Sequence, residues 1–320
     1  YPATNGCDPN REAPVYDLII RDAIIIHSSG RLVADIAVEE GKIAYVGSNT
    51  GGPAKEEIQG IGRFVIPGVI DSQVRFRGPG QGDGDDWVAG SRAAVTSGIT
   101  TVLDLPDGVQ SRAQLEKRLK SARAASVTNS GSWVQATPHN LDDVAEAVAS
   151  GQAAAPYARM DHVDSPDGLD IDGISALFDR VPSLVGLHAE DAKVLKRGLR
   201  KWAEVPDPVH NDVRPIKAAA AAVQQLLDLV HERQHPVHIC SMSTATELNL
   251  LDPYREDLPI STSVAPYHLF LSVETAAAQG DNIKVDPPVR TELDRRALWA
   301  SIKRGRIDTF HSGHLPLDTK

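Results

Sequence analysis

The chain has 320 residues and a mass of 34.3 kDa, enough for one large domain with a small additional one. Its formal net charge of −10 arises from acidic and basic residues that are interspersed, so no basic stripe is visible and nucleic acid is excluded as the main partner. No run approaches the roughly 20 apolar residues of a membrane-spanning helix, so we expect no membrane partner.

The first residues give little sign of a core. Residues 1–15 are rich in Pro, Asn and charge, and we expect an arm there. From 16 to 62 the chain alternates apolar and polar residues in short runs, which predicts a small β module. Gly41 and Lys42 lie between two such runs, as residues of a hairpin turn would.

After residue 63 the pattern changes to strands that alternate with helices. Parallel strands need such crossovers, and eight units in roughly 250 residues predict a (β/α)₈ barrel over 63–320. An open doubly wound sheet is the alternative, but no Gly-rich phosphate fingerprint follows an early strand. The predicted strands are 64–74, 99–106, 131–137, 155–161, 184–190, 235–243, 260–269 and 307–314.

Polar side chains gather where these predicted strands end, which is where such barrels carry their chemistry. They include Gln73, Arg75 and Arg77 on the first strand, Tyr157 and Asp161 on the fourth, His188 and Glu190 on the fifth, His238, Cys240 and Ser241 on the sixth, and His311 and His314 on the eighth. Strand residues facing a core should be branched and apolar, so this pattern indicates a site.

Several segments, in order, resemble the cyclic amidohydrolases, and dihydroorotases most closely. They are PGVIDSQVRFRGPG, GSRAAVTSGITTVLDLPDG, LHAED, VHICSMST, APYHLFL, KVDPPVR and TELDRRALWASIKRGRIDTFHSGH, and the resemblance extends from about 16 to 318. It implies hydrolysis of a cyclic amide by one or two divalent metals, which lower the pKa of bound water and polarise the carbonyl.

The ligand positions of that family are mostly changed here. The His-x-His pair is Gln73 and Arg75, and the position of the bridging Lys holds Tyr157. The sixth-strand His is Ser241, and Gly313 stands where the eighth strand carries the proton-transferring Asp. His188 is retained, and Asp161 could replace the bridging group. With so few donors the sequence predicts a degenerate site with no metal, no cofactor and no catalytic residue.

Other interpretations of these residues stay open. Arg77 matches the arginine that binds the substrate carboxylate in dihydroorotases, although an ion pair with Asp85 or Asp86 is favoured. A relocated metal site could gather Cys240, His188, Asp161, His311 and His314. Ser241 or Cys240 beside His238 could act as a nucleophile, but adjacent strand residues face opposite sides. The residual pocket is predicted at Arg77, Asp161, His188 and His314.

The resemblance also bears on partners. In the family, a final helix and further strands follow the eighth-strand motif and complete the β module, so we expect an open edge that favours pairing with another chain. The main prediction is a catalytically inactive assembly component, as a homo-oligomer or in a complex such as that of aspartate carbamoyltransferase in pyrimidine synthesis. The alternatives are a small-molecule binder using the vacated pocket, and a hydrolase of cyclic amides with a relocated metal site.

The cysteines complete the sequence-based predictions. Cys7 and Cys240 are too few for a disulfide framework. Isolated thiols are typical of a reducing compartment, so we predict a cytoplasmic protein. The chain begins at Tyr1 rather than Met, which leaves an excised signal peptide open.

Overall fold

The computed structural model divides the chain into two compact units, before and after the boundary between Gly68 and Val69. It describes residues 15–77, 86–105, 108, 111–161, 167–205, 209–276 and 284–315. The predicted arm therefore lies outside the described residues, apart from Val15. In the described part of the chain, no helix is long and apolar enough to cross a membrane.

The first unit is a sheet with the order β3-β2-β1-β4, in which β5 also pairs with β1. The hairpin is present, because β2 and β3 are antiparallel, but its turn lies one residue earlier than predicted: Glu40 and Gly41 have positive φ, and Lys42 already pairs with Glu39 in β3. Two consecutive residues with positive φ match the right-handed twist of the strands they join. The strands are β1 (Tyr16–His27), β2 (Gly30–Glu39), β3 (Lys42–Gly47), β4 (Ala54–Gln59) and β5 (Phe64–Val65).

The strand predicted over 64–74 is two strands in two different units. Phe64 and Val65 pair with β1, whereas the barrel begins with β6 at Val69. Pro67 lacks a backbone N–H and cannot donate to a strand ladder, so the run that sequence pattern alone joins is interrupted there.

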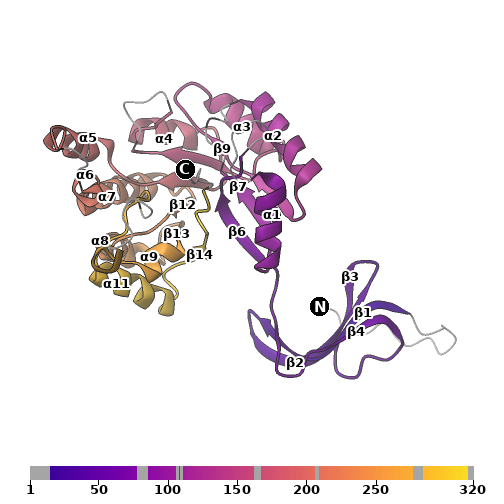
Figure 1. Ribbon diagram of the computed structural model, residues 1–320. Coiled ribbons are helices and arrows are strands. Elements are labelled where there is room, and N and C mark those ends of the chain that lie inside the picture. Colours follow the sequence, from indigo (N-terminus) through magenta and orange to yellow (C-terminus); the bar gives the residue numbers. More distant parts are fainter. Residues whose placement is uncertain are drawn as a thin grey trace. The chain divides into compact units, whose positions relative to one another are not determined.

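The second unit contains the predicted eight-stranded barrel, closed from two parallel sheets (Figure 1). One sheet has the order β6-β7-β8 and the other β14-β13-β12-β11-β10-β9. Its strands are β6 (Val69–Val74), β7 (Ile99–Asp104), β8 (Asn129–Ser132), β9 (Val134–Gln135), β10 (Pro156–Arg159), β11 (Val185–His188), β12 (Val237–Cys240), β13 (Ile260–Val264) and β14 (Thr309–Phe310).

Two seams join these sheets into a ring. At the first seam, β8 pairs with β7 and β9 pairs with β10, while the intervening Trp133 donates its N–H to the Asp104 carbonyl at 2.9 Å. At the second seam, Val74 bridges His314, and the Arg75 N–H donates to the His314 carbonyl at 2.8 Å. β8 and β9 thus act as one barrel strand, which gives eight barrel strands in the part of the chain that the structure describes.

Helices surround the strands in Figure 1. Several begin at a side chain that caps the first turn: Asp86 caps α1, and Ser111, Thr244 and Thr291 form capping boxes for α2, α8 and α11. The helices are α1 (Trp87–Thr96), α2 (Arg112–Ala125), α3 (Leu141–Ala149), α4 (Ile171–Phe178), α5 (Ala192–Lys201), α6 (His210–Val213), α7 (Ile216–Arg233), α8 (Ala245–Leu251), α9 (Pro266–Phe270), α10 (Val273–Ala276) and α11 (Glu292–Lys303), with the 3₁₀ turn η1 (Asp252–Tyr254).

A buried ion pair holds α2 against the first two barrel strands. Arg118 donates from Nε to Asp104 Oδ2 at 2.6 Å and from Nη2 to Oδ1 at 3.1 Å, and it also donates to the Phe76 carbonyl. Asp104 Oδ1 accepts the Phe76 N–H at 3.3 Å. The Asp104 side chain is 0% exposed and that of Arg118 is 11% exposed, so the carboxylate has no water as an alternative partner.

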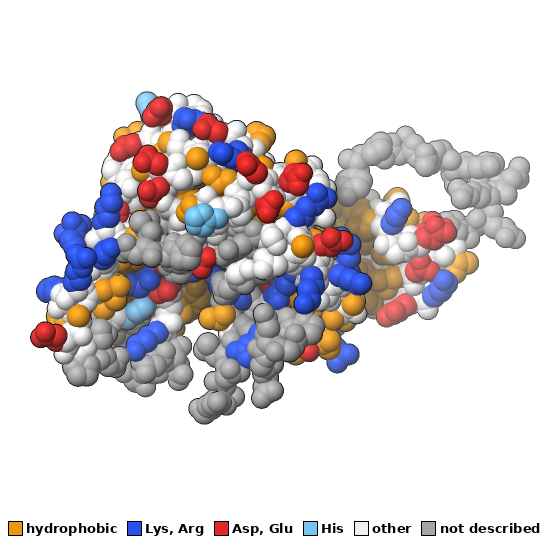
Figure 2. Space-filling view, turned by 90° about the horizontal axis from the view of Figure 1, so that it is seen from above, with side chains coloured by type: hydrophobic (Ala, Val, Ile, Leu, Met, Phe, Trp, Pro, Cys, Tyr) orange, Lys and Arg blue, Asp and Glu red, His pale blue; other side chains and the backbone are white. Residues whose placement is uncertain are grey.

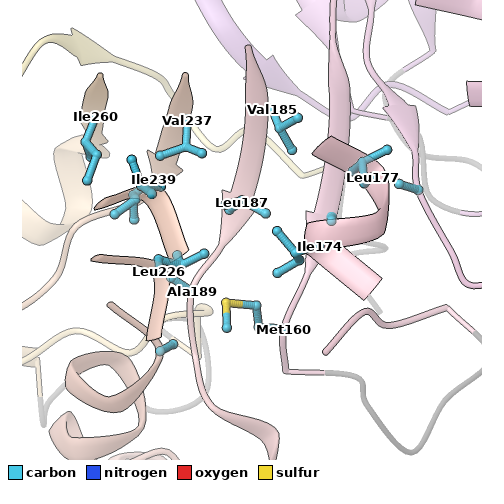
Figure 3. Packing of buried hydrophobic residues seen from close by; sticks show 14 of the residues in the cluster. Met160, Ile174, Leu177, Val185, Leu187, Ala189, Leu226, Val237, Ile239 and Ile260 are labelled. Carbon is cyan, nitrogen blue, oxygen red and sulfur yellow. The ribbon is translucent and has the colours of Figure 1, made fainter. Parts of the chain in front are cut away.

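The main core lies between the strands and the helices that cover them. In Figure 3, Leu187 on β11 lies between Ile239 of β12 and Leu226 of α7 on one side and Ile174 and Leu177 of α4 on the other. On the outside, Figure 2 shows acidic, basic and apolar side chains interspersed over the visible face. This surface agrees with the charge pattern of the sequence.

Replacing Leu187 with Ala is expected to lower the free energy of unfolding by about 2–5 kcal/mol, because a fully buried side chain leaves a cavity that its neighbours only partly fill. Leu199→Ala is the matched control, since Leu199 is 58% exposed on α5 and its truncation should change stability by less than about 0.5 kcal/mol. Urea unfolding of both variants measures the difference. Equal effects would contradict the placement of Leu187 in the core.

Side chains fill the inside of the barrel. Trp133 contacts Tyr157 edge-on, with ring centroids 6.2 Å apart, and its Nε1 donates to the Ser72 carbonyl at 2.8 Å. A Cβ at Gly186 would lie 2.6 Å from the Trp133 ring, so the glycine leaves space for the indole. Tyr157 and Cys240 belong to the same buried cluster.

Candidate metal centre

The four residues of the predicted pocket do not all meet. Asp161 and His188 come together, with His188 Nε2 at 3.5 Å from Asp161 Oδ2. The backbone of Arg77 instead bridges Asp86 after β6. His314 closes the barrel seam through its backbone, and its ring lies edge-on to Phe76 with centroids 5.8 Å apart. Asp161 and His188 therefore lie together, whereas Arg77 and His314 are each placed by other contacts.

A third ligand joins this pair, namely Glu190. His188 ends β11 and Glu190 follows two residues later, and its Oε2 lies 2.9 Å from His188 Nε2. One potential ligand atom from each of Asp161, His188 and Glu190 lies within 4.8 Å of the other two. These three residues are called the triad below. The triad is buried at the C-terminal ends of β10 and β11, the end at which barrels of this type carry their chemistry.

Two arginines hold the triad carboxylates. Arg159 binds Asp161 through both oxygens, at 2.9 and 2.8 Å. Arg214 Nη2 lies 2.7 Å from Asp161 Oδ2 and 3.3 Å from His188 Nε2, and it also donates to Glu190 Oε2. The guanidinium of Arg214 therefore contacts every member of the triad.

These charges determine the protonation of the carboxylates. Burial alone would raise the pKa of Asp161, but the charges of His188, Arg159 and Arg214 outweigh it and hold the pKa well below its usual value. Glu190 behaves in the same way: burial raises its pKa, and His188 and Arg214 lower it further than burial raises it. Both carboxylates are ionised at neutral pH and available as ligands.

The triad fits a divalent cation in its chemistry. One imidazole and two carboxylates are a donor set that zinc and other divalent transition metals accept. Glu190 Oε1 is buried and has no hydrogen-bond partner among the described residues, and the nearest charge in an ion pair with it is Arg290 Nη2 at 3.7 Å. Leaving a buried carboxylate oxygen without a partner costs free energy, and coordination of a metal ion would remove that cost.

The expectation that the protein uses no metal cofactor is therefore wrong. That expectation was based on the family's ligand positions taken one at a time. Four of those positions hold non-ligand residues here, namely Gln73, Arg75, Ser241 and Gly313. Glu190 was missed as a ligand, although its spacing of two from His188 places both on one side of an extended segment. The Arg214 contact had no sequence signal, since Arg214 is 53 positions from Asp161.

The proposed nucleophile pairing of Ser241 with His238 does not occur. His238 Nδ1 instead contacts Ser261 Oγ at 2.8 Å, and Ser241 Oγ contacts His311 Nε2 at 2.9 Å. Burial lowers the pKa of His311 to about 3, so it would be a weak base toward the Ser241 hydroxyl. Burial also raises the pKa of the Cys240 thiol to about 12, which leaves it unreactive.

Curated proteins with similar sequences carry hydrolase names. The chain is 32% identical to a dihydroorotase from Methanothermobacter thermautotrophicus over 291 residues, covering 88% of the chain and 65% of the relative. It is 30% identical to a dihydroorotase from Methanosarcina mazei, covering 94% and 69%, and 26% identical to an allantoinase from Deinococcus radiodurans, covering 94% and 70%. The chain thus spans about two thirds of the length of these relatives.

Solved structures show the same fold. An L-hydantoinase (dihydropyrimidinase) from Arthrobacter aurescens matches with a TM-score of 0.87 at 22% identity, covering 94% of the chain and 69% of that protein. A D-hydantoinase from Bacillus sp. AR9 matches with a TM-score of 0.85, also at 22% identity, covering 95% and 70%. No family model matches the chain. The barrel, the collinear segments and the dihydroorotase relatives together show that the chain belongs to the cyclic amidohydrolase superfamily and is dihydroorotase-like.

Proposed function

We propose that this protein is a hydrolase of cyclic amide C–N bonds that uses one divalent metal held by Asp161, His188 and Glu190. The observation that carries the proposal is the convergence of the three ligands within 4.8 Å at the ends of β10 and β11. The family supports the reaction class, because its named members are dihydroorotases, allantoinases and hydantoinases.

Each residue of the triad has a definite part in this proposal. A bound metal would polarise a substrate carbonyl and lower the pKa of water. Arg159 fixes Asp161 through a bidentate contact, and β11 fixes the His188 ring at its last residue. Glu190 Oε1 is available either as a second ligand atom or as the acceptor of a proton from the attacking water.

Purified protein supplied with Zn²⁺ or Mn²⁺ is expected to open the ring of dihydroorotate or hydantoin, and His188→Ala is expected to reduce the rate at least about 100-fold by removing the imidazole ligand. Chromatography of substrate and product measures the rate. His139→Ala is the matched control, because His139 is exposed and lies outside the triad. Turnover that is insensitive to His188→Ala would disprove the assignment.

A second candidate is the non-catalytic assembly component, with the metal bound at the triad. It is favoured by Gln73 and Arg75 at the positions of the family's His pair and by Gly313 at the position of its catalytic Asp. An aspartate carbamoyltransferase or a second copy of the chain is the partner proposed for it. Absence of turnover in a metal-loaded sample that light scattering finds to be oligomeric would favour this candidate over the hydrolase.

A further inference from the structure

We infer that Arg214 competes with the metal for the triad, so that the guanidinium must withdraw before a cation can bind. The inference rests on the metal site of the proposed function. Its first support is geometric: the Nη2 atom lies 2.7 Å from Asp161 Oδ2 and 3.3 Å from His188 Nε2, and it also donates to Glu190 Oε2. One nitrogen thus already binds the atoms that would coordinate the metal.

The charge balance of the cluster gives the second support. Leaving the histidines His188 and His210 aside, the ion pairs of the cluster among the described residues join three carboxylates to three guanidinium groups. The carboxylates are Asp161, Glu190 and Asp286, and the guanidinium groups are Arg159, Arg214 and Arg290. A divalent cation added to this balanced set would leave two positive charges in excess in a largely buried region, where like charges repel strongly. Withdrawal of Arg214 toward Asp286 moves one positive charge away from the triad and frees the ligand atoms.

Asp286 gives the withdrawn guanidinium a place to go. Its Oδ1 already lies 3.2 Å from Arg214 Nε, and its side chain is 40% exposed, compared with 0% for Asp161 and 1% for Glu190. A rotation of the Arg214 side chain could therefore keep the contact with Asp286 and release the two buried carboxylates. The backbone can stay in place, because Arg290 Nη1 donates to the Arg214 carbonyl at 2.6 Å.

Substitutions of Arg214 and Asp286 are expected to change the affinity for the metal in opposite directions. Arg214→Gln removes the competing charge and should strengthen Zn²⁺ binding by about 100-fold or more, the scale of a buried charge left without its partner. Asp286→Asn removes the charge that receives Arg214, so it should weaken Zn²⁺ binding by about 10-fold. Arg233→Gln is the matched control, since Arg233 pairs with Asp179 at the exposed end of α7 and should leave the affinity unchanged.

Isothermal titration calorimetry with Zn²⁺ tests the inference on wild type, Arg214→Gln, Asp286→Asn, Arg233→Gln, His188→Ala and the double variant Arg214→Gln/His188→Ala. The expected order of affinity is Arg214→Gln above wild type and Asp286→Asn below it, with the double variant losing the gain. If Arg214→Gln folds poorly without metal, the Asp286→Asn result and a rise in Tm on adding Zn²⁺ still decide the question.

Other results would separate a failure of the competition from a failure of the metal site. Wild-type binding as tight as that of Arg214→Gln, with both abolished by His188→Ala, would overturn the competition and leave the metal site standing. No binding at the triad in any variant would overturn the metal site of the proposed function together with the competition. Stronger binding in Asp286→Asn would contradict the role given to Asp286.

Discussion

Between pH 7 and pH 5 the protein is expected to lose about 2 kcal/mol of stability through His238 alone, and His238→Asn is expected to remove that loss. Burial lowers the pKa of His238 to about 4, whereas an imidazole in the unfolded chain has a pKa of about 6.5. In this window the unfolded state binds a proton that the folded state does not bind, so acidification favours unfolding. The loss is absent above about pH 7, grows as the pH falls, and reaches its full size below about pH 4.

Other buried groups act in the same pH range, which is why the comparison is made between variants. Burial also lowers the pKa of His268 to about 4 and that of His311 to about 3, so these residues add losses of similar size. Burial raises the pKa of Asp104 and Glu247, and these carboxyls contribute with the opposite sign. Subtracting the variant from wild type cancels these contributions and isolates His238.

Urea unfolding at pH 7, 6 and 5 provides the measurement. Asn is chosen because its side-chain amide can reproduce the contact of His238 Nδ1 with Ser261 Oγ. His231→Asn is the matched control, because His231 is exposed on α7 and meets water in both states. A stability difference between wild type and His238→Asn that does not change with pH would show that His238 is not a buried neutral imidazole.

Arg118→Met is expected to destabilise the protein by about 3–5 kcal/mol, because it leaves the fully buried carboxylate of Asp104 without its countercharge. The same change also removes the donor to the Phe76 carbonyl, so the end of β6 loses an anchor. Thermal or urea unfolding gives the size of the effect. It should become smaller at lower pH, where the carboxyl, whose pKa burial already raises, takes up a proton.

Arg112→Met provides a control on the same helix. Arg112 pairs with Glu146, but the two side chains are 49% and 68% exposed, and such a surface pair contributes about 0–1 kcal/mol. A loss at Arg118 no larger than that at Arg112 would mean that Asp104 is well solvated. Replacing both partners, as Asp104→Leu with Arg118→Met, should recover part of the lost stability.

Sequence pattern predicted the barrel because it depends on local repetition. Each strand and its following helix has its own periodicity, and the order of units leaves few topologies. The errors lie at boundaries. The interruption at Pro67 and Gly68 separates β5 from β6, and Trp133 divides one predicted strand into β8 and β9 because the two halves pair with different neighbours.

The site was harder to predict because its contacts are not local. His188 and Asp161 stood out as polar residues at strand ends, and Glu190 had the spacing to join them. Arg214 follows the short helix α6, and only folding brings its guanidinium to Asp161 and Glu190. The family's ligand positions show which ligands are lost, but they do not show that the retained His188 combines with Glu190, which is not one of those positions.

The second barrel seam, where Val74 and Arg75 meet His314, is expected to open before the other strand pairs of the barrel. Between β11 and β12 four residue pairs are in register, but β6 meets the opposite side of the ring at one bridge, Val74 with His314, assisted by the Ser312 N–H on Asp71 Oδ1 at 3.0 Å. Local opening takes place where few hydrogen bonds must break. The backbone amides of Arg75 and Ser312 would thus exchange with solvent through brief openings of the ring, while those of β11 and β12 would exchange only when the whole barrel unfolds.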